Sequence, residues 1–260
     1  MDRRSFTGLL GAMTATAAHQ AGKPAVAPKT KYYVLENYYL KSGTQPERIH
    51  AFMRDALLPA LNQVHRGPKL FLEALVAPHR PQLAFLAGVG SIDQLFSMIE
   101  ALWRQEDFRK AVDAWEAHPE PPCEHNAASL LEAAEYSPEI APLSPPPKTP
   151  RIFELRVYHS PTGRRLRAAH ELLADMEARV FHRCGLDPLL YASTFFGVNR
   201  PNITYLIPFE NLAAREKAWT TFAADPDWIK ARKESLAQHG EAITVMDISL
   251  FRATPYSPIR

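Results

Sequence analysis

The chain contains the same unit twice, and this internal repeat limits the folds open to it. A single shift of 120 residues aligns the two halves without a gap. Identical residues at this spacing include the pairs His50 and His170, Tyr38 and Tyr158, and Pro68 and Pro188. The register continues to the end of each half, where Tyr136-Ser137-Pro138 corresponds to Tyr256-Ser257-Pro258. Because repeated units bury their hydrophobic faces against each other, we expect two packed copies of one fold.

Each half shows the same predicted order of secondary structure. Residues 151–160 alternate apolar and polar side chains with the period of two that is typical of a strand. Apolar residues from Leu166 to Cys184 recur at helical spacing, and Gly185 stands where a helix cap belongs. Continuing in this way, we predict strands at 31–40, 69–76, 83–89, 127–133, 151–160, 189–196, 203–209 and 243–253, and helices at 46–64, 92–115, 166–184 and 212–238. The last helix should be interrupted at Asp225-Pro226, where the aspartate can cap a restarted helix and the proline can take its first position.

The order strand, helix, strand, strand, helix, strand is that of the ferredoxin-like sandwich, whose two helices cover one face of a four-stranded sheet. The other sheet face is bare and must be buried against something. Since the chain carries two such units, the natural partner is its own second copy. We predict an α+β protein in which two tandem ferredoxin-like β-α-β-β-α-β units pack sheet to sheet as an intrachain pseudo-dimeric αβ-barrel.

The segments outside the repeats have separate roles. Residues 1–18 resemble a twin-arginine export signal, with Arg3-Arg4, Phe6 and a short apolar stretch ahead of small residues. Residues 137–150 are rich in proline and have no hydrophobic period, which predicts a stiff linker. The repeats then occupy residues 31–136 and 151–258. From the leader we expect a periplasmic or secreted protein.

Charge and composition exclude several classes of partner. The chain has 30 Lys and Arg against 28 Asp and Glu, so its formal charge of +2 creates no field that would attract nucleic acid. Its apolar stretches are shorter than the roughly 20 residues of a membrane-spanning helix. The sequence is compatible with a homodimer. Cys123 and Cys184 fall in different elements of different halves, and we do not expect them to pair.

Several segments of the second half together resemble the NIPSNAP family. They are the strand 153–158, the segment 200–206, the motif Asp225-Pro226-Asp227-Trp228 and the terminal Pro255-Tyr256-Ser257-Pro258. The similarity covers about residues 152–258 and is weaker in the first half. It implies a ferredoxin-like fold of the dimeric αβ-barrel class. The family as a whole has no settled enzymatic activity, so the resemblance implies little chemistry.

Two histidines are the candidate catalytic residues. His50 and His170 occupy equivalent positions near the apolar side of the first helix of each half. An imidazole there could act as a general base or ligate haem iron, and a packed histidine satisfied by one hydrogen bond is the alternative. The sequence has no zinc-binding spacing, phosphate loop or nucleophile elbow, so it predicts no metal site.

The candidate ligand-binding residues lie on strands. Arg156 and Tyr158 in the second half alternate with apolar residues, and Glu36 and Tyr38 are their equivalents in the first half. Tyr205 on a neighbouring strand is the fifth candidate. We expect the first four inside the barrel, on the sheet face away from the helices. Phenols and charges together would suit a small polar or aromatic ligand there. Packing between the sheets with satisfied hydroxyl groups is the alternative.

Three functional classes remain for this chain. The favoured one is an exported, non-catalytic small-molecule-binding or assembly protein without a cofactor, because no complete catalytic set can be recognised. The second is a small αβ-barrel enzyme of the cofactor-free oxygenase or isomerase kind. The third is a haem-binding barrel. The fold by itself does not choose among them.

Overall fold

Two four-stranded sheets join edge to edge into one closed barrel. The computed structural model describes residues 29–143 and 147–260, so the leader lies outside the described residues. The strands are β1 (Tyr32–Tyr39), β2 (Lys69–Val76), β3 (Gln82–Val89), β4 (His125–Ala133), β5 (Ile152–His159), β6 (Leu190–Phe196), β7 (Asn202–Phe209) and β8 (Val245–Ala253). Their order around the barrel is β1-β3-β2-β8-β5-β7-β6-β4, with antiparallel neighbours throughout. The predicted intrachain pseudo-dimeric αβ-barrel is confirmed.

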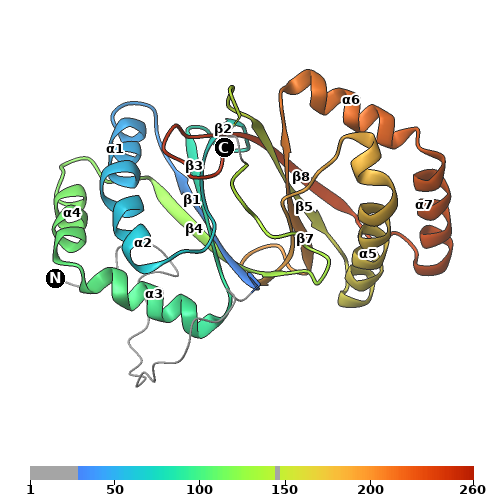
Figure 1. The fold of residues 1–260 in the computed structure, drawn as a ribbon, viewed down its shortest axis with the longest axis horizontal. Coiled ribbons are helices and arrows are strands. Elements are labelled where there is room, and N and C mark those ends of the chain that lie inside the picture. The colour runs from blue at the N-terminus through green and yellow to red at the C-terminus, as the bar shows by residue number, and fades with distance from the viewer. Residues whose placement is uncertain (1–28, 144–146) are drawn as a thin grey trace.

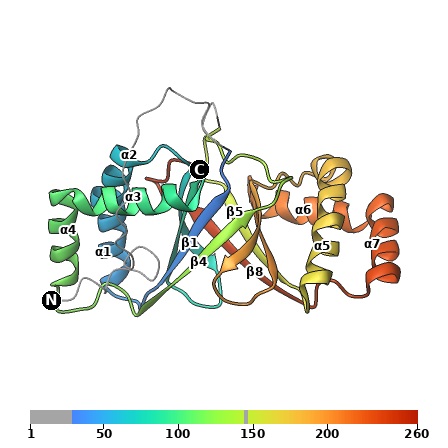
Figure 2. The ribbon, with the colours of Figure 1, turned by 90° about the horizontal axis from the view of Figure 1, so that it is seen from below.

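The helices form two outer groups on opposite sides of the barrel (Figures 1 and 2). Those of the first half are α1 (Gln45–Phe52), the π-helical turn η2 (Met53–Leu57), α2 (Leu58–Val64), α3 (Ile92–Arg104) and α4 (Glu106–Glu116). Those of the second half are α5 (Gly163–Met176), the π-helical turn η3 (Glu177–Phe181), the short 3₁₀ helix η4 (His182–Cys184), α6 (Leu212–Ala223) and α7 (Pro226–His239). No helix in the described part of the chain is both long and apolar enough to cross a membrane.

One predicted helix is interrupted. We expected a continuous helix over residues 92–115, but Gln105 has an extended backbone, with φ −72° and ψ 117°, and separates α3 from α4. Its side-chain Nε2 donates to the carbonyl oxygen of Ala60 at 3.0 Å, which ties the break to α2. The equivalent break in the second half, at Asp225-Pro226, is the one that the sequence predicts from its proline.

Two ladders between the halves close the barrel. Strand β2 pairs with β8, with Leu72 opposite Ala253, and β4 pairs with β6, with Leu131 opposite Thr194. The interior between the two sheets is filled by side chains from both halves, mainly leucines: Leu35, Leu72, Leu86, Leu131, Leu155, Leu190 and Leu206. This shared apolar core is the reason the bare sheet faces stay together.

The segments that follow the last strand of each half cross to the other half. Ser137 Oγ accepts from the backbone N–H of Tyr191 at 3.0 Å, and Ser257 Oγ accepts from that of Phe71 at 3.1 Å. Phe71 and Tyr191 are equivalent positions of the repeat, so the exchange is reciprocal. In both views the red C-terminal tail leaves β8 and reaches the first half (Figures 1 and 2). Each half therefore helps to hold the other.

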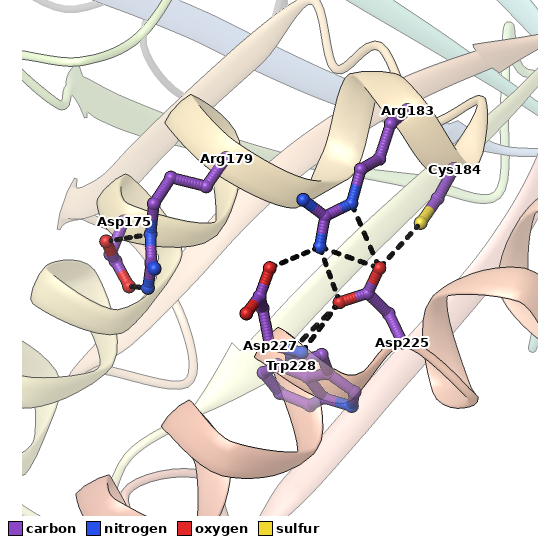
Figure 3. Close-up of polar contacts among 7 residues, drawn as sticks. All are labelled: Asp175, Arg179, Arg183, Cys184, Asp225, Asp227 and Trp228. Atoms are coloured by element: carbon purple, nitrogen blue, oxygen red, sulfur yellow. Dashed lines mark hydrogen bonds and ion pairs between the residues drawn. The ribbon is translucent and has the colours of Figure 1, made fainter.

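The motif Asp225-Pro226-Asp227-Trp228 fastens the start of α7 to η4 (Figure 3). Asp225 caps α7 by accepting from the backbone N–H groups of Asp227 and Trp228, at 2.9 and 3.2 Å. The guanidinium of Arg183, in η4, bonds both Asp225 and Asp227, the latter at 2.6 Å. A helix cap of this kind is worth about 1 kcal/mol, so the motif has a structural role. Cys184 lies beside it as a free thiol, and Cys123 is also free.

Candidate functional site

The candidate ligand-binding side chains face the helices rather than the barrel interior. Tyr38 packs with α1 and α3 residues in the core of the first half, whereas Tyr33 and Leu35 of the same strand line the barrel. On β5 the apolar Phe153 and Leu155 point into the barrel. The predicted orientation is therefore wrong. The error has a physical reason, because both faces of each sheet are buried. The alternation of side chains along a strand then separates the two faces without showing which one the helices cover.

A charged cluster lies between the sheet and α6 in the second half. Glu154 on β5 is 0% exposed and accepts hydrogen bonds from the guanidinium groups of Arg156, on the same strand, and Arg215, on α6. Two cations thus share one buried carboxylate. Arg215 also lies 3.9 Å from the exposed Glu216, a pair that solvent screens. Apart from Glu216, the cluster has a surplus of one positive charge, with Arg156 buried and Arg215 partly buried.

Aromatic rings surround this arginine pair. The guanidinium carbon of Arg156 lies 3.7 Å from the centre of the Trp219 ring, a close cation–π contact. Arg156 also donates from Nη1 to the Tyr158 hydroxyl, and the Tyr158 and Tyr205 rings meet edge to face at 5.0 Å. Trp219 Nε1 is buried and has no hydrogen-bond partner among the described residues. Three of the predicted residues, Arg156, Tyr158 and Tyr205, are therefore brought together.

The first half is apolar at four of the six positions of this cluster, the other two being Glu36 and Tyr38. A shift of 120 residues places Val34, Phe85, Leu95 and Ile99 where the second half has Glu154, Tyr205, Arg215 and Trp219. All four first-half residues are buried in the hydrophobic core. Since one backbone plan packs well with apolar side chains, the polar cluster is not required by the fold. It is specific to the second half and marks that half as the candidate site.

One side of the cluster is left uncovered. On β8, Ile248 lies opposite Arg156 and Met246 opposite Tyr158, and they are 40% and 57% exposed. Directly opposed residues of antiparallel strands share a sheet face, so these apolar side chains stand beside the cluster. None of the α7 side chains, all of which the structure describes, is buried. Met246 and Ile248 accordingly form an exposed apolar surface beside Arg156 and Tyr158.

His170 belongs to a hydrogen-bond network next to this cluster. Its Nδ1 lies 2.9 Å from the Tyr136 hydroxyl, and its Nε2 lies 2.7 Å from Ser193 Oγ. The Tyr136 ring contacts that of Tyr191, which donates its hydroxyl to Glu177 at 2.6 Å and stacks on Tyr205. Burial lowers the pKa of His170, so the ring is neutral at pH 7.

His50 makes the equivalent contact in the first half. Its Nδ1 lies 2.8 Å from the hydroxyl of Tyr256, and Tyr256 follows the last strand of the second half. Tyr136 and Tyr256 are themselves equivalent, so each histidine binds the tyrosine tail of the other half. Burial lowers the pKa of His50, which the charge of Glu73 partly offsets. These contacts match the packed-histidine alternative better than a catalytic role.

Haem ligation does not fit the surroundings of either histidine. Both ring nitrogens of His170 are engaged in hydrogen bonds, which leaves none to bind iron. His50 Nδ1 is bonded to Tyr256, and Nε2 lies 4.0 Å from the Glu73 carboxylate. The structure has a cavity of about 860 Å³ beside the C-terminal end of α2, and neither histidine lines it. We therefore derive no function through haem.

Glu36 and Tyr38 form a separate pair in the first half. The Tyr38 hydroxyl donates to Glu36 Oε2 at 2.6 Å, and Glu36 is 0% exposed. The second carboxyl oxygen, Oε1, has no hydrogen-bond partner in the described part of the chain. Burial raises the pKa of Glu36 to about 7, although the bond from Tyr38 favours the charged form. The pair is far from the arginine cluster in the fold, so the structure does not unite all the predicted ligand-binding residues.

Glu154, Arg215 and Trp219 are the members of the cluster that sequence reasoning missed. Glu154 and Arg156 alternate on β5, but Arg215 and Trp219 lie on α6, about 60 residues further along the chain. A signal was present in the repeat. Where the first half has the apolar Val34, the second has a charged residue at a position that must be buried, and buried carboxylates need cationic partners.

Comparison with protein families supports the resemblance in the second half. Residues 153–258 match the NIPSNAP family model. The match spans the β5 strand, the Asp225-Pro226-Asp227-Trp228 motif and the exchanged tail with Tyr256, which were the features that carried the resemblance. No curated protein sequence matches the chain.

Solved structures share the whole-chain fold. A protein from Fusobacterium nucleatum proposed to be a monooxygenase aligns with a TM-score of 0.53 at 8% identity, over 86% of this chain and 93% of that one. An anthrone oxidase-like protein gives a TM-score of 0.52 at 13% identity, over 86% and 92% of the two chains. A second proposed monooxygenase, from Lactobacillus acidophilus, gives 0.50 at 10% identity over 86% and 94%. Likeness at these identities shows a common αβ-barrel fold.

Proposed function

We propose that the protein binds a small aromatic anion on the uncovered sheet face of its second half. The observation that carries the proposal is the arginine pair that shares the single buried carboxylate of Glu154. A negatively charged ligand group would balance the surplus positive charge. Trp219 and Tyr158 offer ring contacts, and Met246 and Ile248 offer exposed apolar surface, so an aromatic body is favoured over a purely polar one.

Binding of 2-naphthoate tests this proposal. We expect the wild-type protein to bind 2-naphthoate and to bind neutral 2-acetylnaphthalene much more weakly. Arg215→Gln should weaken 2-naphthoate binding by at least about tenfold, because a charge-assisted hydrogen bond contributes about 1.5–3 kcal/mol. Isothermal titration calorimetry would measure both affinities, and native mass spectrometry of the purified protein would show whether an aromatic anion co-purifies.

Arg232→Gln is the matched control, since Arg232 is an exposed arginine on α7 outside the cluster. It should leave the affinity for 2-naphthoate unchanged. Equal affinity of the wild type for the acid and the neutral ketone would contradict an anion-binding site. Equal losses in Arg215→Gln and Arg232→Gln would contradict its placement at the arginine pair.

An oxygen-consuming enzyme is the second candidate. It is favoured by the whole-chain likeness to two proposed monooxygenases and an anthrone oxidase-like protein, together with the Tyr158, Tyr205 and Tyr191 rings that line the second-half core. A quinol substrate would require a base, and Glu177, whose pKa burial raises, accepts from the Tyr191 hydroxyl at 2.6 Å in this row of rings. Oxygen uptake with a quinol would support this candidate, and binding without uptake would support the first.

Export is part of the proposed function. The paired Arg3-Arg4 lies in the part of the chain outside the described residues, so the proposal rests on the sequence. We expect the protein to be found outside the cytoplasm when it is produced in a bacterium with a twin-arginine pathway. The variant Arg3→Lys/Arg4→Lys should accumulate in the cytoplasm, whereas Arg164→Lys should be exported normally. Cell fractionation would measure this, and equal export of all three forms would refute it.

A further inference from the structure

A cavity of about 860 Å³ lies in the first half, away from the arginine cluster. It is open to solvent on one side and is lined by the end of α2, the start of β2, the end of β3, the linker and the C-terminal tail. Its apolar walls are Pro68, Val89, Ile140, Pro142 and Ile259. A volume of this size falls in the range of about 300–1,000 Å³ that is typical of small-molecule sites. Figure 2 shows the C-terminus beside this end of the first half.

The cavity wall contains a buried lysine without an acidic partner. Lys69 is 6% exposed, and its Nζ donates to the carbonyl oxygens of His65 and Gly67, at 2.9 and 3.2 Å. An ammonium group has three donors, so one is left over. No carboxylate forms an ion pair with Lys69 in residues 29–143 and 147–260. Arg66, on the same wall, adds a second positive charge.

His65 supplies a further buried polar group beside Lys69. It is 3% exposed, and its Nε2 has no hydrogen-bond partner among the described residues. Burial and the charge of Lys69 lower the pKa of His65 to about 4, although an interaction with the Gly88 backbone opposes them, so the ring stays neutral. Of the acids, Glu139 also lines the cavity, but it accepts from the backbone N–H of Thr30 at 2.7 Å. The positive charges of Lys29, Arg66 and Lys69 therefore outnumber the negative one.

The repeat does not account for these polar residues. At the positions equivalent to His65 and Lys69, the second half has Gly185 and Leu189. Leu189 packs in the apolar core at the position where Lys69 carries a buried charge. A buried cation is costly unless something compensates it. Since the same strand position is apolar in the other copy, Lys69 is not needed for folding of the unit.

We propose that this cavity binds a carboxylate with an apolar body. The carboxylate group would lie at Lys69, within reach of Arg66, and the apolar body would lie against Ile140, Pro142 and Ile259. Because the last three residues come from the linker and the C-terminal tail, ligand binding would also bear on how the two halves are joined. This site is distinct from the aromatic-anion site of the second half.

Octanoate is a suitable probe for this site. 1-Octanol has the same chain length without the charge, and inorganic phosphate has negative charge without an apolar body. Isothermal titration calorimetry on the full chain should show that octanoate binds at least tenfold more tightly than either counterpart. Lys69→Met, which keeps the apolar stem and removes the charge, should weaken octanoate binding by about tenfold. Arg66→Gln, at an exposed position, should weaken it severalfold and keeps the test decisive if Lys69→Met fails to fold.

Two controls separate this site from general anion binding. Lys233→Met, on the exposed side of α7, and Arg215→Gln, in the second-half cluster, should both leave octanoate affinity unchanged. The proposal is overturned if octanoate and 1-octanol bind equally, if phosphate binds as tightly as octanoate, or if neither Lys69→Met nor Arg66→Gln alters the affinity. A loss of octanoate binding in Arg215→Gln would assign the binding to the other site and would also overturn it.

Discussion

Replacing Glu36 by glutamine is expected to remove a large part of the pH dependence of stability. In the wild type, burial raises the pKa of Glu36 from its usual 4.5 to about 7 in the folded state. The folded protein therefore holds a proton that the unfolded chain releases between these values, and the free energy of unfolding falls as the pH rises from about 4.5 to about 7. At 1.36 kcal/mol for each pKa unit, the loss is roughly 3 kcal/mol.

Glutamine cannot ionise, so Glu36→Gln should show no such loss. The side-chain amide keeps an oxygen that can accept from the Tyr38 hydroxyl, which retains the hydrogen bond of the wild type. Relative to the wild type, the variant should gain roughly 3 kcal/mol in free energy of unfolding between pH 4.5 and pH 8. Urea titrations at a series of pH values would measure the difference.

The control for this experiment is Glu132→Gln, on β4. Glu132 is a partly exposed carboxylate near Lys31, and it should follow the wild-type pH profile closely because solvent screens exposed pairs. Parallel profiles of Glu36→Gln and the wild type would show that Glu36 ionises as freely in the folded state as in the unfolded chain. They would contradict its assignment as a buried acid.

Removal of Glu154 is the second large effect that we expect. Glu154→Leu would leave Arg156, which is 8% exposed, and Arg215 without their shared carboxylate. Loss of one partner of a buried ion pair costs about 3–5 kcal/mol, because the remaining charge stays buried and uncompensated. We therefore expect a drop of this size in the free energy of unfolding at pH 7, measured by urea denaturation.

The double variant Glu154→Leu/Arg156→Met should recover part of that loss. It removes the stranded charge, and Arg215 can extend its side chain toward solvent because it is only partly buried. The surface pair Asp175 and Arg179 supplies the control, since Asp175→Ala should cost no more than about 0.5 kcal/mol. A double variant that is less stable than Glu154→Leu alone would show that Arg156 stabilises the fold without Glu154.

Much of the architecture could be predicted because it depends on local pattern and on the repeat. The strand at residues 151–160 and the break at Pro226 follow from alternation and from proline chemistry, and both are found. The break at Gln105 could not be predicted in the same way. It carries no proline or glycine signal, and the bond from Gln105 to Ala60 that accompanies it joins residues of different helices.

The candidate site was predicted only in part, and the reason is again distance along the chain. Arg156, Tyr158 and Tyr205 lie on neighbouring strands, so sheet pairing brings them together as soon as the topology is known. Arg215 and Trp219 join them because α6 packs over β7, a contact that no local pattern specifies. The roles of Tyr136 and Tyr256 were missed for the same reason, since each binds a histidine of the other half.

By itself, the sequence determined the repeat, the order of elements and the pairing of two ferredoxin-like units, because these depend on periodicity and on the need to bury a bare sheet face. Only the tertiary structure decided which face of each strand meets the helices. With both faces buried, alternation is equally compatible with either orientation, and the choice comes from how the two copies pack. That choice fills the barrel with leucines and puts Glu154, Arg156 and Arg215 under α6.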